Sequence, residues 1–170
     1  MQNASGKIIA FLDSDDYWLP QRLEKQVKFM MQNKYNFTFC NYKKIFNKKK
    51  KIEVTSKNKK ISYNDLLNDC EIGLSTVLLS KSIIENNLFP PLKTKEDYVA
   101  WLKITKKNIF AYNYPEYLVE WNYNKYQLSS NFFQKIIDGF RVYFIYLKLS
   151  LFKSIFYLFL LGFNSIKRKF

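Results

Sequence analysis

The apolar positions near the start of the chain predict one strand–loop–helix–strand unit. Residues 7–12 form an almost unbroken apolar run, which is typical of a strand buried on both faces. A helix is expected from Pro20 to about Asn33, because proline is favoured in the first helical turn. Residues 36–42 alternate between apolar and polar side chains, which predicts a second strand. Ligands bind at the carboxyl ends of strands in open α/β sheets, so the loop after residue 12 is a candidate site.

The first predicted helix has one apolar face. Leu19, Leu23, Val27 and Met30 recur at the spacing of a helical turn, and the basic side chains fall elsewhere. We therefore expect these apolar side chains to pack against the sheet.

The middle of the chain is predicted to consist of short elements joined by polar loops. Residues 43–60 hold nine lysines and one glutamate, which indicates a solvated loop or hairpin or, alternatively, a contact with anionic headgroups or diphosphate-linked substrates. The elements expected after it are short helices at 62–68 and 81–87, a helix at 96–107, and strands at 75–80, 109–112 and 116–121.

A long, strongly apolar helical stretch is predicted from Asn131 onward. Arg141, Lys148 and Lys153 interrupt it, and the uncharged run from 154 to 165 is too short to cross a bilayer unaided. We favour one or two amphipathic helices on an anionic membrane surface, since the chain closes with lysine and arginine. The alternatives are a helix that packs on the domain core or on other protein, and a transmembrane helix.

Charge and composition narrow the classes of function. The 170 residues carry a formal net charge of +14, which favours an anionic partner such as a nucleic acid, an acidic membrane surface or a phosphorylated substrate. Sequence-specific nucleic-acid binding is not expected, because the cations are mostly lysines and base readers depend on arginine. The chain contains no histidine, so acid–base chemistry falls to carboxylates, lysine, tyrosine or cysteine.

Three carboxylates, Asp13, Asp15 and Asp16, follow the first predicted strand. One interpretation is a solvated turn with a helix cap, since aspartate is common at both. The other is a divalent cation, which would relieve the repulsion among the carboxylates. A calcium loop is excluded because Trp18 stands where such a loop needs glycine and Pro20 opens a helix inside it. Magnesium or manganese that shares substrate phosphates fits the pattern better.

A second acidic pair, Glu96 and Asp97, opens the helix predicted at 96–107. Helix capping is one explanation, because the helix dipole stabilises a carboxylate near the N-terminus by about 0.3–1 kcal/mol. A general base is the other, since no histidine is available for that role.

The acidic motifs belong to a longer series of segments. They are Ala4–Pro20, Leu23–Gln26, Ser75–Leu79, Glu96–Leu102 and Leu128–Asn131. The first contains Gly6-Lys7-Ile8-Ile9-Ala10-Phe11-Leu12-Asp13-Ser14-Asp15-Asp16, and the later ones follow in order and at fitting distances. Over residues 4–131 this series resembles the middle of family 2 glycosyltransferases.

The resemblance implies an α/β fold: a truncated GT-A (Rossmann-like) mixed sheet flanked by helices, followed by C-terminal amphipathic helices. The transferase domain would occupy residues 1–130 and the apolar, basic helical segment residues 131–170. The implied activity is inverting transfer from a nucleotide-diphosphate sugar to a glycan or lipid-linked acceptor, in bacterial surface polysaccharide synthesis. The implied location is cytoplasmic, at the inner face of the cell membrane.

Carried over by position, the resemblance assigns roles to individual residues. Asp15 would bind Mg²⁺ or Mn²⁺ directly, with Asp13 near the nucleotide ribose and the metal and Asp16 as an auxiliary acid. Asp97 would be the catalytic base that deprotonates the acceptor hydroxyl, with Glu96 as its neighbour.

Two tryptophans have expected roles, and the sequence differs from the family pattern in two places. Trp18 offers an apolar face to a sugar, whereas Trp101 is expected in the core. The chain lacks the family's N-terminal nucleotide-binding half, and it has Trp121-Asn122, with Lys125 nearby, where many members carry a Tyr-Arg pair. We expect either a truncated product that is inactive alone or a chain whose missing half another chain supplies; the alternative is a non-catalytic remnant that binds a membrane or a partner protein.

Overall fold

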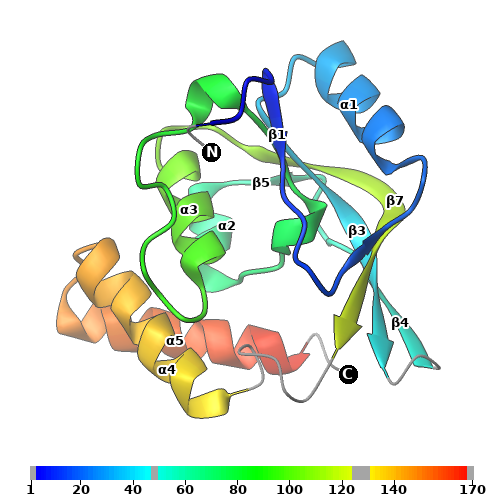
Figure 1. Ribbon diagram of the computed structural model, residues 1–170. Coiled ribbons are helices and arrows are strands. Elements are labelled where there is room, and N and C mark those ends of the chain that lie inside the picture. The colour runs from blue at the N-terminus through cyan, green and yellow to red at the C-terminus, as the bar shows by residue number, and fades with distance from the viewer. Residues whose placement is uncertain (1–2, 47–49, 124–130, 168–170) are drawn as a thin grey trace.

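One mixed sheet lies at the centre of the molecule, whose computed structural model describes residues 3–46, 50–123 and 131–167 (Figure 1). Its strands are β1 (Ile8–Ala10), β2 (Tyr17–Trp18), β3 (Phe37–Phe46), β4 (Lys50–Val54), β5 (Lys60–Ile61), β6 (Leu78–Ser80) and β7 (Ala111–Tyr123). The strand order is β1-β6-β3-β7-β2, with β4 paired to β3 and β5 paired to β7. The long strands β3 and β7 are parallel, and the other pairs are antiparallel.

Helices cover both sides of this sheet, as the predicted α/β class requires. They are α1 (Arg22–Gln32), α2 (Tyr63–Asn68), α3 (Glu96–Thr105), α4 (Phe132–Arg141) and α5 (Leu151–Lys167), with the 3₁₀ turns η1 (Leu74–Thr76) and η2 (Lys81–Ile83) and the π-helical η4 (Val142–Tyr146). In Figure 1, α1 lies on one side of the sheet, α2 and α3 lie on the other, and α4 and α5 pack beneath them.

The first strand is present but shorter than expected. Within the described residues β1 pairs with β6 alone, so it stands at an edge of the sheet. Its middle residue, Ile9, is buried, whereas Ile8 and Ala10 are half-buried. The prediction of a strand buried on both faces is therefore wrong, because Ile8 and Ala10, which point to the face opposite Ile9, stay partly exposed.

The lysine-rich residues 43–60 include a hairpin, which confirms one of the two expected conformations. Strand β3 continues to Phe46 and pairs with β4, and Lys43 and Glu53 form a cross-strand ion pair of 3.1 Å. The two short strands expected at 109–112 and 116–121 are one strand, β7. Pro115 is accommodated at a register irregularity opposite Asn41, a place where a strand tolerates proline.

The inner face of α1 differs from the predicted apolar face. Of the predicted side chains only Met30 is buried, and Leu23 is 43% exposed. The buried positions are Arg22 and Gln26 instead. Gln26 donates a hydrogen bond of 2.9 Å to the carbonyl of Thr76, and Arg22 donates one of 3.3 Å to the carbonyl of Val77. These polar side chains satisfy carbonyls of the η1 turn, which an apolar face cannot do.

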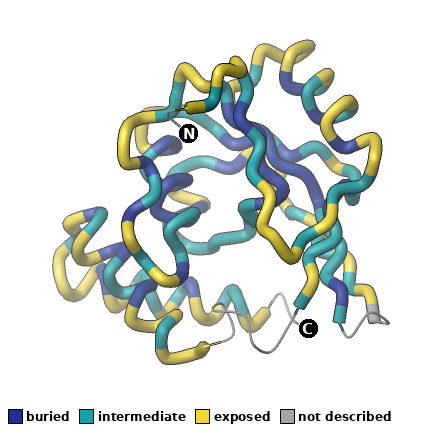
Figure 2. The backbone as a smooth tube through the Cα atoms, in the orientation of Figure 1, coloured by how far each residue is buried: buried dark blue, intermediate teal, exposed yellow. Residues whose placement is uncertain are grey.

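The core lies between the sheet, α3 and the C-terminal helices, where Figure 2 shows buried backbone. Trp101 is fully buried, as expected, and its ring lies 5.2 Å from that of Phe37. The same hydrophobic cluster includes Val142, Tyr143 and Leu161, so it contains residues from both sides of the boundary expected at residue 130. In the described ranges, no helix combines the length and the apolar character that a bilayer span requires.

Candidate active site

The acidic loop, residues 13–16, joins β1 to β2 and is anchored by the buried hydroxyl of Ser75. The Ser75 Oγ accepts a hydrogen bond of 3.0 Å from the Asp13 backbone amide and donates one of 2.5 Å to Asp16 Oδ2. The Asp16 amide donates to the Asp13 carbonyl at 3.1 Å, which closes the turn. A single side chain therefore fixes both ends of the loop.

Asn122 and Trp18 hold the acidic loop from β7 and β2. The Asn122 side-chain amide donates a hydrogen bond of 2.6 Å to the Asp15 carbonyl, and its backbone amide donates one of 3.3 Å to Asp16 Oδ1. Trp18 Nε1 donates to the Ser75 carbonyl at 2.9 Å, and the Arg22 guanidinium stacks 4.0 Å above the Trp18 ring. These contacts fix the backbone of the loop from the sheet side.

The second acidic pair, Glu96 and Asp97, begins α3 as predicted. The turn before it is held from α4, because the backbone amide and the hydroxyl of Thr94 both donate to Asp138 Oδ2 at 3.0 Å. Lys95 then adopts a left-handed conformation with φ of 67°, a geometry that costs a side chain about 1–2 kcal/mol. Such backbone strain persists only where the surrounding structure enforces it.

Two buried tyrosine hydroxyls fix α3 against the C-terminal helices. The hydroxyls of Tyr98, on α3, and Tyr143, on η4, are 2.8 Å apart. Tyr143 also donates to the carbonyl of Leu67 at 2.9 Å, and Tyr98 donates to that of Leu66. The residue next to Asp97 in the chain is thus tied to both α2 and η4.

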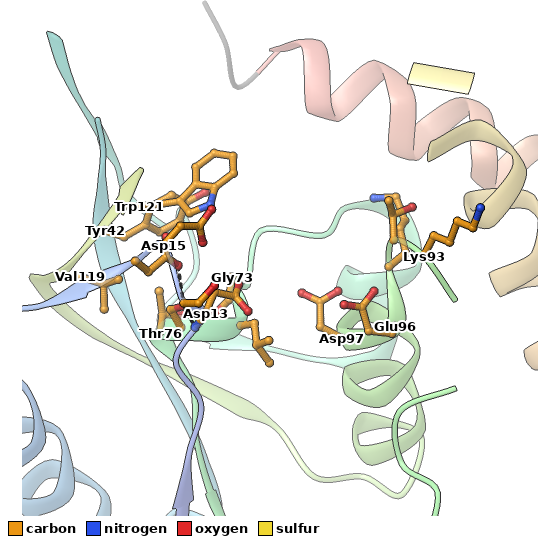
Figure 3. A pocket seen from close by; sticks show the side chains of 16 residues that line it. Asp13, Asp15, Tyr42, Gly73, Thr76, Lys93, Glu96, Asp97, Val119 and Trp121 are labelled. Carbon is orange, nitrogen blue, oxygen red and sulfur yellow. Dashed lines mark hydrogen bonds between the residues drawn. The ribbon is translucent and has the colours of Figure 1, made fainter. Parts of the chain in front are cut away.

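A cavity of about 420 Å³ lies between the acidic loop and the start of α3. Figure 3 shows Asp13 and Asp15 on one side of this cavity and Glu96 and Asp97 on the other. Trp121 lies beside Asp15 in this wall of the cavity. The two acidic motifs are far apart in the sequence, but the fold brings both to the same cavity.

Burial and mutual repulsion raise the pKa values of the carboxyl groups around this cavity. The pKa of Asp97 is raised to about 6, first by burial and then by Glu96, although Lys95 opposes the rise. Burial, together with Asp13 and Asp15, raises the pKa of Asp16 to about 6 despite the hydrogen bond from Ser75. The pKa of Asp13 is raised by burial and by Asp15. Added positive charge would therefore be favourable at the acidic loop.

The donor atoms of the acidic loop suit a hard divalent cation that brings other ligands with it. Across the described residues, no cluster of three or more candidate ligands is arranged as a closed metal site. Magnesium and manganese commonly take one or two protein carboxylates and complete their shell with water and substrate phosphates. Asp13 and Asp15 beside an open cavity fit that requirement.

The structure brings five of the six predicted site residues to one cavity: Asp13, Asp15, Asp16, Glu96 and Asp97. Trp18 is not among the residues that line it; one face of its ring is covered by Arg22, and its indole N–H supports Ser75. The Ser/Asn segment at 128–130 and Lys125 lie outside the described residues.

Sequence reasoning assigned no site role to Ser75, Asn122 or Trp121. The first two hold the acidic loop, and Trp121 lines the cavity. Ser75 stands in one of the segments that carry the resemblance, and Trp121-Asn122 stands at the position of a family pair. Their partners are far away in the chain, so only the fold reveals the contacts.

Comparison with known proteins places these features in a family. The sequence model described as Glycosyl transferase family 2 matches residues 1–85, half of the chain, and confirms the resemblance. The Escherichia coli protein WfgD, a UDP-Glc:alpha-D-GlcNAc-diphosphoundecaprenol beta-1,3-glucosyltransferase, is 38% identical over 137 residues, covering 80% of this chain and 53% of WfgD. TuaG of Bacillus subtilis (strain 168), a glycosyltransferase named for teichuronic acid biosynthesis, is 32% identical and covers 77% of this chain and 52% of TuaG. The chain thus spans about half the length of these relatives.

A solved structure shows the same fold. TarS residues 1–349 from S. aureus, in complex with UDP-GlcNAc, match with a TM-score of 0.63 and 17% sequence identity, covering 85% of this chain and 43% of that chain. At this identity the likeness shows the fold alone, which is the GT-A mixed sheet flanked by helices, as predicted.

Proposed function

Because this chain belongs to glycosyl transferase family 2, we propose that its cavity is the site of an inverting sugar transfer from a nucleotide-diphosphate sugar. One observation carries the proposal: the acidic loop and Asp97, distant in sequence, face each other across a cavity of about 420 Å³. Sugar transfer needs both a place for the departing diphosphate and a base for the acceptor, and the two motifs supply one each.

The acidic loop forms the donor side. Asp15, with Asp13 beside it, would hold Mg²⁺ or Mn²⁺ together with the donor diphosphate, and Asp13 would also contact the nucleotide ribose. The ion, when bound, offsets the negative charge that develops on the departing diphosphate. Ser75 and Asn122 support this role because their hydrogen bonds hold the loop in place before any ligand arrives.

Asp97 forms the acceptor side as the catalytic base, with Glu96 beside it. The acceptor oxygen attacks the anomeric carbon from the face opposite the diphosphate and forms the new C–O bond. The bond from that carbon to the diphosphate breaks, and the acceptor proton passes to the Asp97 carboxylate. Inversion follows from this single displacement. A pKa of about 6 supports the assignment, because Asp97 is then more basic than an ordinary carboxylate yet still ionised near neutral pH.

The relatives support a bacterial surface polysaccharide as the product. We propose a UDP-sugar donor and a glycan or lipid-linked acceptor, because WfgD, as its name states, uses UDP-Glc and a diphosphoundecaprenol-linked acceptor. TuaG, named for teichuronic acid biosynthesis, agrees with that class of pathway. We therefore propose that the protein works at the cytoplasmic face of the cell membrane.

We also propose that transfer requires the remainder of a full-length domain, in the same chain or in another one. The support is twofold. The relatives are about twice as long as the part of them that this chain covers. Among the described residues, β1 pairs on one side only, so its other edge is open to a further strand.

Titration calorimetry with UDP and Mn²⁺ tests the donor side directly. We expect heat from the wild-type chain only when both are present, and at least tenfold weaker binding in Asp15→Asn. The matched control is Glu24→Gln, which removes an exposed carboxylate of α1 far from the cavity.

The control should bind as tightly as the wild type. Absence of metal-dependent UDP binding by the wild-type chain, or equal affinity in Asp15→Asn, would overturn the proposed metal–diphosphate site.

A further inference from the structure

The C-terminal helices carry an exposed apolar surface. Of the exposed large hydrophobic side chains in the described chain, all but Leu12, Tyr17, Leu23 and Met31 belong to α4, η4 and α5. We call this surface the outer face; Figure 2 shows the exposed turns of these helices on the side away from the sheet. Scattered exposed leucines need no explanation, but exposed apolar side chains concentrated on neighbouring helices mark an interaction site.

Helix α5 shows why the outer face is not part of the core. Ser154 and Leu161 are buried on its inner side, in contact with the domain. Phe152 is 85% exposed and Phe159 is 68% exposed, and Phe156 and Phe163 continue the same stripe at helical spacing. The helix is thus apolar on two sides, and the folded chain covers only one of them.

The charges around the outer face have one sign. Lys148, Lys153 and Lys167 are exposed, and Lys167 lies over the ring of Phe163 with its Nζ 5.7 Å from the ring centre. The one carboxylate between residues 131 and 167 is Asp138, which is buried and turned toward Thr94. Cations beside aromatic and aliphatic side chains, with no exposed acid between residues 131 and 167, complement an anionic and apolar partner.

We propose that the outer face docks on the surface of an anionic lipid bilayer. The apolar side chains enter the boundary between headgroups and acyl chains, and the lysines bind the anionic headgroups. Lying on the membrane fits the finding that no described helix is suited to span it. A second copy of the chain is a poorer occupant, because face-to-face pairing would bring like charges together.

Docking would also place the cavity relative to the membrane. Asp138, on α4, accepts both hydrogen bonds from Thr94 in the turn before Glu96 and Asp97. Lys135, on the same helix, lines a hollow of about 190 Å³ that also contains Asp97. The docking surface is therefore attached to the base side of the cavity, where an acceptor that protrudes from the membrane would arrive.

Vesicle flotation of the intact chain tests the apolar part of the proposal. Wild-type protein should float with vesicles of phosphatidylethanolamine and phosphatidylglycerol. Phe152→Ser with Phe159→Ser should lower the partition coefficient at least tenfold, because both side chains are exposed and their loss leaves the core intact. The matched control is Leu23→Ser with Met31→Ser, which removes two exposed apolar side chains from α1 and should float as the wild type does.

A lysine pair tests the electrostatic part. Lys153→Gln with Lys167→Gln should weaken flotation, and Lys57→Gln with Lys59→Gln, equally exposed but remote from the outer face, should have less effect. Binding should fall with added salt and be weak on phosphatidylcholine vesicles.

Several outcomes would overturn the proposal. They are unchanged flotation of the serine variant, equal binding to anionic and neutral vesicles, and a wild-type dimer in sedimentation that the serine pair converts to a non-floating monomer. Far-UV circular dichroism checks that each variant is folded. The assay contains neither nucleotide nor metal, so its result is independent of the proposed sugar transfer.

Discussion

At the scale of single residues, the environment of Asp97, the proposed base, opposes stability. Burial and the neighbouring Glu96 both disfavour its ionised form. The groups that face it are Glu96 and Lys95 on its own segment, Asp13 across the cavity and Lys135 from α4. The proposed role as a base requires the ionised form, because only a carboxylate can accept a proton. The ionised Asp97 carboxylate is therefore retained although it lowers the stability of the fold.

The sign of the resulting pH dependence is definite. Between the ordinary aspartate pKa of 3.8 and the folded value of about 6, the native chain binds more protons at Asp97 than the unfolded chain does. The contribution of Asp97 to the free energy of unfolding therefore falls as the pH rises through this window. Above about pH 6, the ionised Asp97 carboxylate lowers the free energy of unfolding.

Asp97→Asn should therefore be more stable than the wild type at neutral pH. We expect the free energy of unfolding, from urea titrations followed by tryptophan fluorescence, to increase by about 1–3 kcal/mol near pH 7. The gain should disappear near pH 4, where the wild-type carboxyl is protonated. Asparagine retains the oxygen that accepts the 2.7 Å hydrogen bond from the Tyr98 amide, so no structural loss offsets the effect.

Glu24→Gln, at an exposed position of α1, is the control and should show no such pH-dependent gain. A loss of stability in Asp97→Asn at neutral pH would contradict the partly buried carboxylate, repelled by Glu96, whose pKa is raised.

At the scale of elements, α1 reverses the expectation drawn from its apolar spacing. Leu23 belongs to the predicted inner face but is 43% exposed, whereas Gln26 is fully buried. Leu23→Ser should therefore cost less than about 0.5 kcal/mol, as surface changes usually do. Gln26→Leu should cost about 1–3 kcal/mol, because the carbonyl of Thr76 loses its partner. Urea unfolding of both variants measures the difference.

If Leu23→Ser lost more stability than Gln26→Leu, the apolar face predicted from the sequence would be the inner face of α1 after all. The pair is informative because the variants change the same helix in opposite directions: one adds a polar side chain outside and the other adds an apolar one inside.

Local signals explain which elements could be predicted. The acidic loop and the Glu96–Asp97 pair were found because each is a short motif beside a strongly patterned strand or helix. The inner face of α1 was missed because the side chains of Arg22 and Gln26 are buried against carbonyls that lie 55 and 50 residues away in the chain. Likewise, the break expected between the strands at 109–112 and 116–121 is absent, because the chain passes Pro115 at a register irregularity against β3. Periodicity within a segment contains no information about such partners.

The same distinction applies to the site. The carboxylates that face the cavity were predicted, whereas Ser75 and Asn122, which hold them, were given no role. Ser75 is 59 residues from Asp16 and Asn122 is 107 residues from Asp15. Either side chain, considered alone, is an ordinary polar residue, and its function follows from the strand order that brings η1 and β7 beside the acidic loop.

At the scale of the whole molecule, the C-terminal helices are both part of the core and the site of the proposed docking surface. Their inner side contributes Val142 and Leu161 to the main hydrophobic cluster. The hydroxyl pair of Tyr98 and Tyr143 adds a buried polar link to α3. The proposed docking surface and Asp97, the proposed base, are therefore connected through rigid packing, and the helices should not unfold separately from the sheet.

We expect one cooperative unfolding transition. Tryptophan fluorescence reports on Trp18, Trp101 and Trp121, all in the part predicted as the transferase domain, whereas far-UV ellipticity also reports on α4 and α5. The two urea transitions should coincide in the wild type. Tyr143→Phe should shift both together by about 1–2 kcal/mol, because the Leu67 carbonyl loses the hydrogen bond that Tyr143 donates. If the ellipticity midpoint falls while the fluorescence midpoint stays, the C-terminal helices form a separate unit and the rigid link between the outer face and Asp97 is refuted.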